Sequence, residues 1–220
     1  MVCAMDGTYI FLAFAPALNR NDFNTRKKRY GLNLLLWCDH KMRVKWFEFG
    51  WPGSVGDNRI WKCSVLYRNY LEYYSPGQFS MSDSGVENKR GNVSLFQKSN
   101  NGVPISGAPK VFNKVMAKPR TRSEHLNTRL KGRFQCLKEY RTCIGKDKKP
   151  EEDLKRIFRT ILSCMILHNM TADHDDFDPD WISGDEGESD DEHDNMNDFE
   201  PDEVGDRLRN FVVQYCVNHN

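Results

Sequence analysis

The sequence predicts an α/β domain in which strands come first and helices follow, ahead of a disordered acidic tail. Apolar strand-like segments fill the first third of the chain, helical patterns follow them, and acids dominate the end. With 220 residues and 39% hydrophobic content, the chain can bury one sizeable core. We therefore expect one domain over residues 1–170, an acidic tail over 171–206, and a short apolar segment over 207–220 that can dock back as a helix or strand.

Strands are expected in four places. The first is Val2–Phe14, an apolar segment that contains a single acid. Gly31–Cys38 and Arg43–Phe49 follow, separated by a polar four-residue turn. Two strands joined by so short a turn form an antiparallel hairpin. A short fourth strand is expected over Gln78–Ser82.

The middle of the chain combines a first helix with a long irregular segment. Trp51–Ser54 breaks the third strand, and Asp57 or Ser54 can cap the helix that follows. Residues 86–120 are rich in Gly, Asn, Ser, Pro and Lys. This composition indicates a long loop with at most short strands.

Two later helices are expected from the spacing of apolar residues. From Arg122 onward, Leu126 and Leu130 lie on one helix face. Glu151–Met170 has a continuous apolar stripe, acids in its first turn and Pro150 at its start. It is the clearest helix in the chain.

Charge is divided sharply along the chain. Residues 1–172 hold 30 of the 32 Lys and Arg but only 14 of the 31 Asp and Glu, an excess of 16 positive charges. The segment 173–206 holds the other 17 acids and no Lys or Arg. Basic residues can serve only for solubility, but an excess of this size favours a body that binds nucleic acid.

Cysteine usage and hydropathy indicate an intracellular protein without a membrane span. The seven cysteines are dispersed and include no C-x-x-C pair, which is typical of reduced thiols and not of a disulfide framework or zinc site. No apolar run approaches the ~18 residues of a membrane span. The apolar segment near the N-terminus lacks the basic start of a signal peptide.

Three acids stand out as candidate metal ligands. Asp6 lies within the first strand, Asp83 follows the fourth, and Glu124 lies in the first turn of the helix expected from Arg122. Carboxylates that converge from two strands and a helix can hold a pair of Mg²⁺ ions for phosphodiester chemistry. Each acid also has an ordinary interpretation: a satisfied strand-end carboxylate, an Asx-turn residue and a first-turn acid favoured by the helix dipole.

Several segments resemble motifs of Harbinger-type DDE transposases, and they occur in the family's order over about residues 2–170. They are Met5–Ile10, Asn24–Tyr30, Trp37–Lys41, Gly50–Arg59, Asp83–Gly85, Glu124 with Arg129–Phe134 behind it, and Cys164–Asn169. The resemblance implies a ribonuclease H-like fold, a mixed sheet whose first three strands are antiparallel, with helices on both faces. It also implies that Asp6, Asp83 and Glu124 hold a divalent cation, Mg²⁺ or Mn²⁺, in a DNA endonuclease or strand-transferase.

The same resemblance implies a nuclear protein that acts on DNA together with a separate Myb-like DNA-binding protein, and it leaves homo-oligomerisation open. Relatives carry an N-terminal helix-turn-helix region before the position of Asp6, which we expect to be missing here. Other departures are Tyr9 in place of a histidine, Val-Glu-Asn-Lys after Gly85, and Ser123 and His125 around Glu124. These departures favour an alternative, a decayed or domesticated derivative that binds DNA or protein without catalysis. A weaker alternative is an interaction protein that acts through its acidic tail.

Basic, aromatic and polar residues complete the set of candidates. Phosphate contacts are expected from Arg26, Lys27, Lys28, Arg29, Arg122, Arg129, Lys131 and Arg133. Trp51 and Trp61 can stack on unpaired bases, although core packing is the commoner role of tryptophan. His168 and Asn169 can support the site or, more often, end their apolar helix. Asp57 can be an extra metal ligand, although a helix N-cap is the commoner role.

Overall fold

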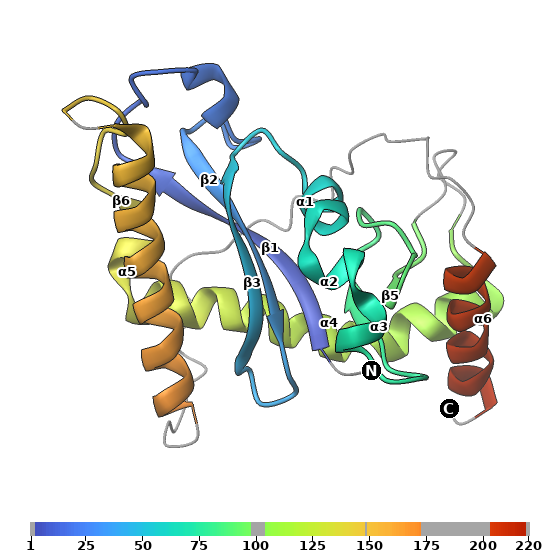
Figure 1. The fold of residues 1–220 in the computed structure, drawn as a ribbon. Helices are drawn as coiled ribbons and strands as arrows, with labels where there is room; N and C mark the ends of the chain where they lie inside the picture. Colours follow the sequence, from blue (N-terminus) through green and yellow to red (C-terminus); the bar gives the residue numbers. More distant parts are fainter. Residues whose placement is uncertain (1–2, 98–103, 148, 173–202, 219–220) are drawn as a thin grey trace.

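The computed structural model describes residues 3–97, 104–147, 149–172 and 203–218. At its centre lies a six-stranded sheet of order β3-β2-β1-β4-β5, with β6 paired to the far end of β1 (Figure 1). β1 to β3 are antiparallel, whereas β4 and β6 run parallel to β1 and β5 runs parallel to β4. The strands are β1 Cys3–Leu12, β2 Gly31–Cys38, β3 Val44–Pro52, β4 Ser80–Ser82, β5 Asn92–Ser94 and β6 Glu139–Tyr140. This mixed sheet confirms the expected ribonuclease H-like arrangement.

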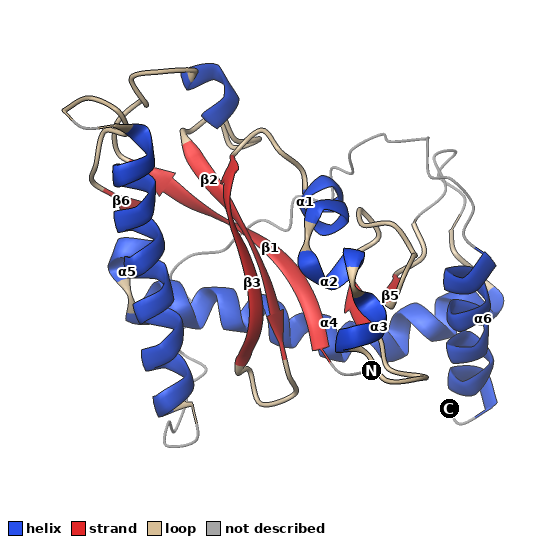
Figure 2. Cartoon of the chain, in the orientation of Figure 1, coloured by secondary structure: helices blue, strands red, loops and turns tan. Residues whose placement is uncertain are grey.

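Helices cover both faces of the sheet (Figure 2). Their bounds are η1 Arg20–Phe23, α1 Asp57–Cys63, α2 Val65–Arg68, α3 Tyr70–Tyr73, α4 Gly107–Arg133, η2 Gln135–Leu137, α5 Pro150–Thr171 and α6 Glu203–Asn218. Successive side chains of a strand point to opposite faces, and β1 shows this clearly. Ala4 and Ile10 pack with α4 and α5, whereas Met5 packs with α1.

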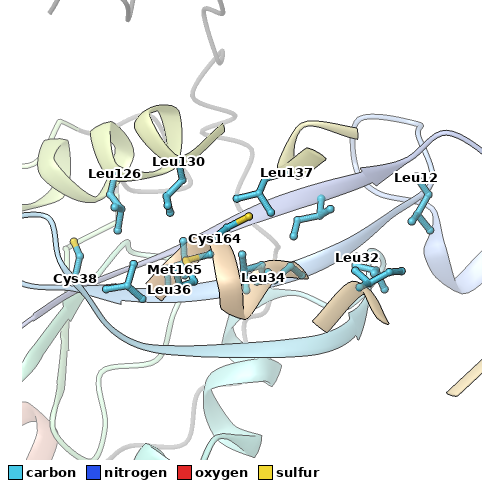
Figure 3. Packing of buried hydrophobic residues seen from close by; sticks show 14 of the residues in the cluster. Leu12, Leu32, Leu34, Leu36, Cys38, Leu126, Leu130, Leu137, Cys164 and Met165 are labelled. Atoms are coloured by element: carbon cyan, nitrogen blue, oxygen red, sulfur yellow. The ribbon is translucent and has the colours of Figure 1, made fainter. Parts of the chain in front are cut away.

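The face toward α4 and α5 is a continuous apolar layer. Figure 3 shows Leu126 and Leu130 of α4 above Leu36 and Cys38 of β2. On the opposite face, Trp61 of α1 is fully buried against Trp37 of β2, with ring centroids 5.9 Å apart. Both faces of β2 are therefore covered, and all eight of its residues are buried.

A separate core joins α4, α6, β4 and β5 at the other end of the sheet. Phe112 and Met116 of α4 pack against Val212 and Val213 of α6. Helix α4 therefore begins at Gly107, and the prediction of a loop up to residue 120 is wrong. The apolar partners of this half-helix come from the end of the chain, so local composition could not reveal them.

Other local predictions are partly corrected. The helix after β3 has Gly56, not Asp57 or Ser54, as its N-cap, and the segment divides into α1, α2 and α3. β3 extends to Pro52, two residues into the segment expected to break it. The helix over Glu151–Met170 is confirmed as α5, and the final apolar segment forms α6.

Most of the predicted acidic tail, residues 173–202, lies outside the described residues. All seven cysteines are free thiols, as expected. Across the parts of the chain that are described, we find no helix both long and apolar enough to cross a membrane.

The packing of α4 against α6 leads to a prediction about stability. Replacing the fully buried Phe112 (Phe112→Ala) should lower the free energy of unfolding by about 3–5 kcal/mol, because it leaves a cavity between α4 and α6. Val115→Ala, at an exposed position of the same helix, should change it by less than about 0.5 kcal/mol. Urea unfolding measures both, and equal effects would contradict the packing described.

Candidate active site

The parallel pairing of β1 with β4 brings two of the predicted acids together. Cys3 pairs with Ser80 and Ala4 with Met81. Asp6 lies two residues after Ala4, still inside β1. Asp83 lies two residues after Met81, just beyond the end of β4. Asp83 is half-buried, and its Oδ1 accepts a 2.7 Å hydrogen bond from the Ser84 backbone N–H. This bond comes from the next residue and not from the one two positions on, so it is not the Asx turn expected of Asp83.

Glu124 reaches the same region from α4. It lies in the interior of that helix, so its predicted place in a first turn is wrong. One turn later, Asn127 donates a 2.7 Å hydrogen bond from Nδ2 to Oδ2 of Asp6, which ties α4 to β1. The Glu124 side chain is 44% exposed and pairs with Arg120 at 3.1 Å.

A fourth acid, Asp57, joins the three that the motifs indicated. Its carboxylate lies so close to the backbone of Gly7 that a Cβ at that position would overlap it. Asn33 fixes it further, by donating 2.8 Å hydrogen bonds to Oδ1 of Asp57 and to the Val55 carbonyl. Since Gly56 is the N-cap and no side chain caps the helix, the N-cap interpretation of Asp57 is wrong. Two features of the sequence could have indicated this contact: the glycine that follows Asp6, and Asn33 as a lone polar residue in an apolar strand.

The electrostatics of Asp6 reflect this crowding. Burial is the largest cause that raises the pKa of Asp6, to about 8 from an ordinary 3.8, although the residue as a whole keeps some exposure. Asp57 and Glu124 raise the pKa further, Asp83 adds a smaller effect, and Arg120 opposes them. Three acids from separate parts of the chain therefore act on Asp6.

The acidic side chains lie near one another, but their positions do not form a complete metal-binding site. Among the described His, Cys, Asp and Glu side chains, no three are close enough together to hold a metal ion. The donor set nevertheless fits a hard cation, because it offers several carboxylates and buried amide oxygens. Beside Asp57 and Asp6, Asn33 Oδ1 and Asn127 Oδ1 are buried and find no hydrogen-bond partner among the described residues. Oxygen ligands of this kind suit Mg²⁺ and Mn²⁺.

A buried brace links the helix of Asp57 to the loop of Asp83. The Glu87 backbone N–H donates a 3.0 Å hydrogen bond to Oδ1 of Asn58, the residue after Asp57. The Glu87 carboxylate, only 3% exposed, pairs with Lys62 of α1 at 3.0 Å. These two contacts of Glu87 hold the helix of Asp57 and the loop of Asp83 together. The sequence patterns had not indicated the residues that make them.

The predicted phosphate-contacting residues fall into two groups. Arg29 pairs with Glu139 at 2.6 Å and stacks on Phe11, Arg129 is buried, and Arg133 donates a hydrogen bond to Thr171. Arg26, Lys27 and Lys28 are exposed in the loop before β2, while Lys131 lines a small cavity with Asn127. Contact with DNA stays a prediction for all of them, and the exposed ones are better placed for it.

Two further candidates have structural roles. The fully buried His168 ring contacts the Met42 carbonyl through Nε2 at 2.8 Å, and Asn169 exchanges two hydrogen bonds with the Val44 backbone. These contacts tie α5 to the β2–β3 hairpin, and the helix continues past both residues to Thr171. Trp61 is buried in the core and Trp51 packs beside it, which agrees with the commoner role of tryptophan.

Comparison with known proteins agrees with the order of motifs. Residues 5–169 match the model of the DDE superfamily endonuclease family. A mouse protein with the provisional name nuclease HARBI1 is 28% identical over 164 residues, which cover 73% of this chain and 43% of that protein. A human protein of the same name is 28% identical over 167 residues, with the same shares. The chain thus spans less than half the length of these curated relatives, and no solved structure matches it significantly.

The contact between Gly7 and Asp57 can be tested directly. Gly7→Ala should displace the Asp57 carboxylate and weaken Mn²⁺ binding by about 10-fold or more, as expected when a ligand loses its position. Gly132→Ala, which meets nothing within 4 Å, should leave Mn²⁺ binding unchanged. Titration calorimetry measures both affinities, and unchanged binding in Gly7→Ala would remove Asp57 from the site.

The raised pKa of Asp6 predicts how stability depends on pH without metal. The folded protein keeps the Asp6 proton up to about pH 8, whereas the unfolded chain loses it near pH 4. The free energy of unfolding should therefore fall as pH rises between these values, by at most about 1.4 kcal/mol per pH unit from this group.

Asp6→Asn should remove this contribution. The free energy of unfolding of the variant should therefore exceed that of the wild type by more at pH 8 than at pH 5. Urea unfolding in the presence of a chelator measures the difference. Asp147→Asn, in an exposed turn, is the control for a lost charge. The same advantage at both pH values would show that Asp6 is not protonated in the folded protein.

Proposed function

Because the chain belongs to the DDE superfamily endonuclease family, we propose that it is a divalent-metal-dependent nuclease that breaks phosphodiester bonds in DNA. The proposed ligands are Asp6, Asp57, Asp83 and Glu124. The observation that carries the proposal is the gathering of acids around Asp6: Asp57 lies against Gly7, and Asp83 follows the strand that pairs with β1. Glu124 lies one turn before Asn127, which donates a hydrogen bond to Asp6, and the other three carboxylates all raise the pKa of Asp6. Such a group of acids requires a positive partner in order to be fully charged.

The chain's own residues prepare this site. Asp6 has to release its proton to act as a ligand, and Asn127 then keeps its carboxylate on the side of α4. Asn33 does the same for Asp57 from β2. When bound, Mg²⁺ or Mn²⁺ would supply an activated water or 3′-hydroxyl and stabilise the leaving oxygen.

DNA as the substrate is supported by charge. Residues 1–172 carry an excess of 16 positive charges, and cations that neutralise phosphates dominate the affinity of proteins for DNA. The strand-transfer reaction, a nuclear location and a separate Myb-like DNA-binding partner belong to the same proposal and rest on the family resemblance.

A second candidate function is DNA binding without catalysis. The observation in its favour is the Arg120–Glu124 ion pair, which directs one of the four acids toward a cation of the protein itself. The departures around Glu124 and after Asp83 agree with it. In this case the chain would bind DNA equally well with and without divalent metal.

One cleavage experiment separates the two functions. With Mn²⁺, the purified chain should cut a terminal-repeat DNA duplex, and Asp83→Asn should lower the rate by about 100-fold or more, as does the loss of one charge-stabilising group from an active site. Asp57→Asn should behave similarly. Asp147→Asn, which removes the same charge from an exposed turn, should cut at the wild-type rate. A wild type no faster than Asp83→Asn would overturn the nuclease and favour the binding protein.

A further inference from the structure

Helix α4 carries a row of four cations, three of which lie in the segment that the sequence predicted to be a loop. Lys110, Lys114, Lys118 and Arg122 occur at every fourth position of the helix, so they lie along one stripe. The three lysines are exposed and Arg122 is half-buried. We call these four residues the α4 stripe, and it extends about 18 Å along the helix axis.

The stripe differs from an ordinary solvated face, because it has no acids. Residues 88–123 contain eight Lys and Arg and no Asp or Glu. Like charges four residues apart destabilise a helix by about 0.2–0.5 kcal/mol per pair. Within the described parts of the chain, no ion pair is found for any of the four residues. An external anion would therefore relieve a cost that is built into the helix.

The packing of α4 fixes where the stripe points. Phe112 and Met116 bury the opposite side of the helix against α6, β4 and β5. At 100° per residue, Lys110 and Lys114 lie about 40° and 80° from Glu124 around the helix axis, whereas Lys118 and Arg122 lie about 120° and 160° from it. Arg122 is only about 3 Å from Glu124 along the axis but about 160° from it around the helix, so a long anion on the stripe would pass beside the candidate active site and not into it.

We propose that the α4 stripe binds the phosphate backbone of the DNA strand next to the bond that is cleaved. Its length corresponds to about five nucleotides of one strand at 3.4 Å each. This inference rests on the proposed function for its substrate class, but it makes a separate statement about binding. The partner is identified by chemistry: a stiff polyanion with regularly spaced phosphates.

The test measures binding of the full chain to a fluorescent 30-base-pair duplex at several salt concentrations, with a chelator present so that cleavage cannot occur. Lys110→Ala, Lys114→Ala and Lys118→Ala are combined in one variant. Lys146→Ala, Lys155→Ala and Arg159→Ala form the matched control, which removes three exposed cations from elsewhere. Alanine keeps helix propensity, and circular dichroism verifies the fold of both variants.

The plot of log affinity against log salt concentration should become shallower by about 2.7 in the stripe variant, or 0.9 for each lost phosphate contact. The control should keep the wild-type slope. Equal changes in both variants, or none, would overturn the stripe as a DNA site. Competition by polyglutamate as strong as that by DNA would also overturn it, and would identify an acidic-peptide surface.

Failure of the proposed function has a different signature. If the chain never cleaves DNA but the stripe variant still shows the shallower slope, the nuclease proposal fails and the stripe remains. If the chain cleaves DNA and the slope is unchanged, the stripe fails and the nuclease remains.

Discussion

Repulsion among four carboxylates is the constraint on which the rest of this structure depends. Asp6 lies inside a strand, where burial alone raises its pKa, and Asp57, Glu124 and Asp83 raise it further. The scaffold holds Asp6 and Asp57 with neutral donors, the amides of Asn127 and Asn33. Neutral donors fix a carboxylate without cancelling its charge. The scaffold therefore adds little positive charge of its own around Asp6, and Arg120 is the cation that opposes the effect of the acids there.

Holding like charges together requires rigid supports, and these come from distant parts of the chain. The Asp83 loop is held on one side by α1, through Glu87. On the other side, Asn88 donates a hydrogen bond to Asp206 of α6, and Gly205 allows the two backbones to approach closely. The guanidinium of Arg209 then stacks 3.5 Å above the Phe96 ring, and burial lowers its pKa to about 10. Helix α6 lies beyond the family-matched residues 5–169, yet it supports one of their acids.

What the sequence could predict depended on whether the deciding contacts were local. β1, β2 and α5 have complete apolar patterns of their own, so their bounds were close to those observed. The order of motifs was enough to associate Asp6, Asp83 and Glu124. The first half of α4 was missed because Phe112 pairs with residues about a hundred positions later. For Asp57 the N-cap interpretation was preferred to that of a metal ligand, because its position depends on the missing Cβ of Gly7, a contact between strand and helix that spacing cannot show.

The position of Glu124 bears on both proposed functions, the metal-dependent nuclease and the DNA-binding protein without catalysis. Glu124 is turned toward Arg120, but the two side chains are 44% and 31% exposed. Ion pairs exposed to this degree contribute only about 0–1 kcal/mol, so little free energy holds Glu124 away from the other acids. Mutual repulsion acts in the same direction for as long as no cation is shared. A cation that several carboxylates share outweighs both effects, because it removes the repulsion and replaces the weak pair at once. The Arg120–Glu124 pair therefore gives the DNA-binding protein little support over the metal-dependent nuclease.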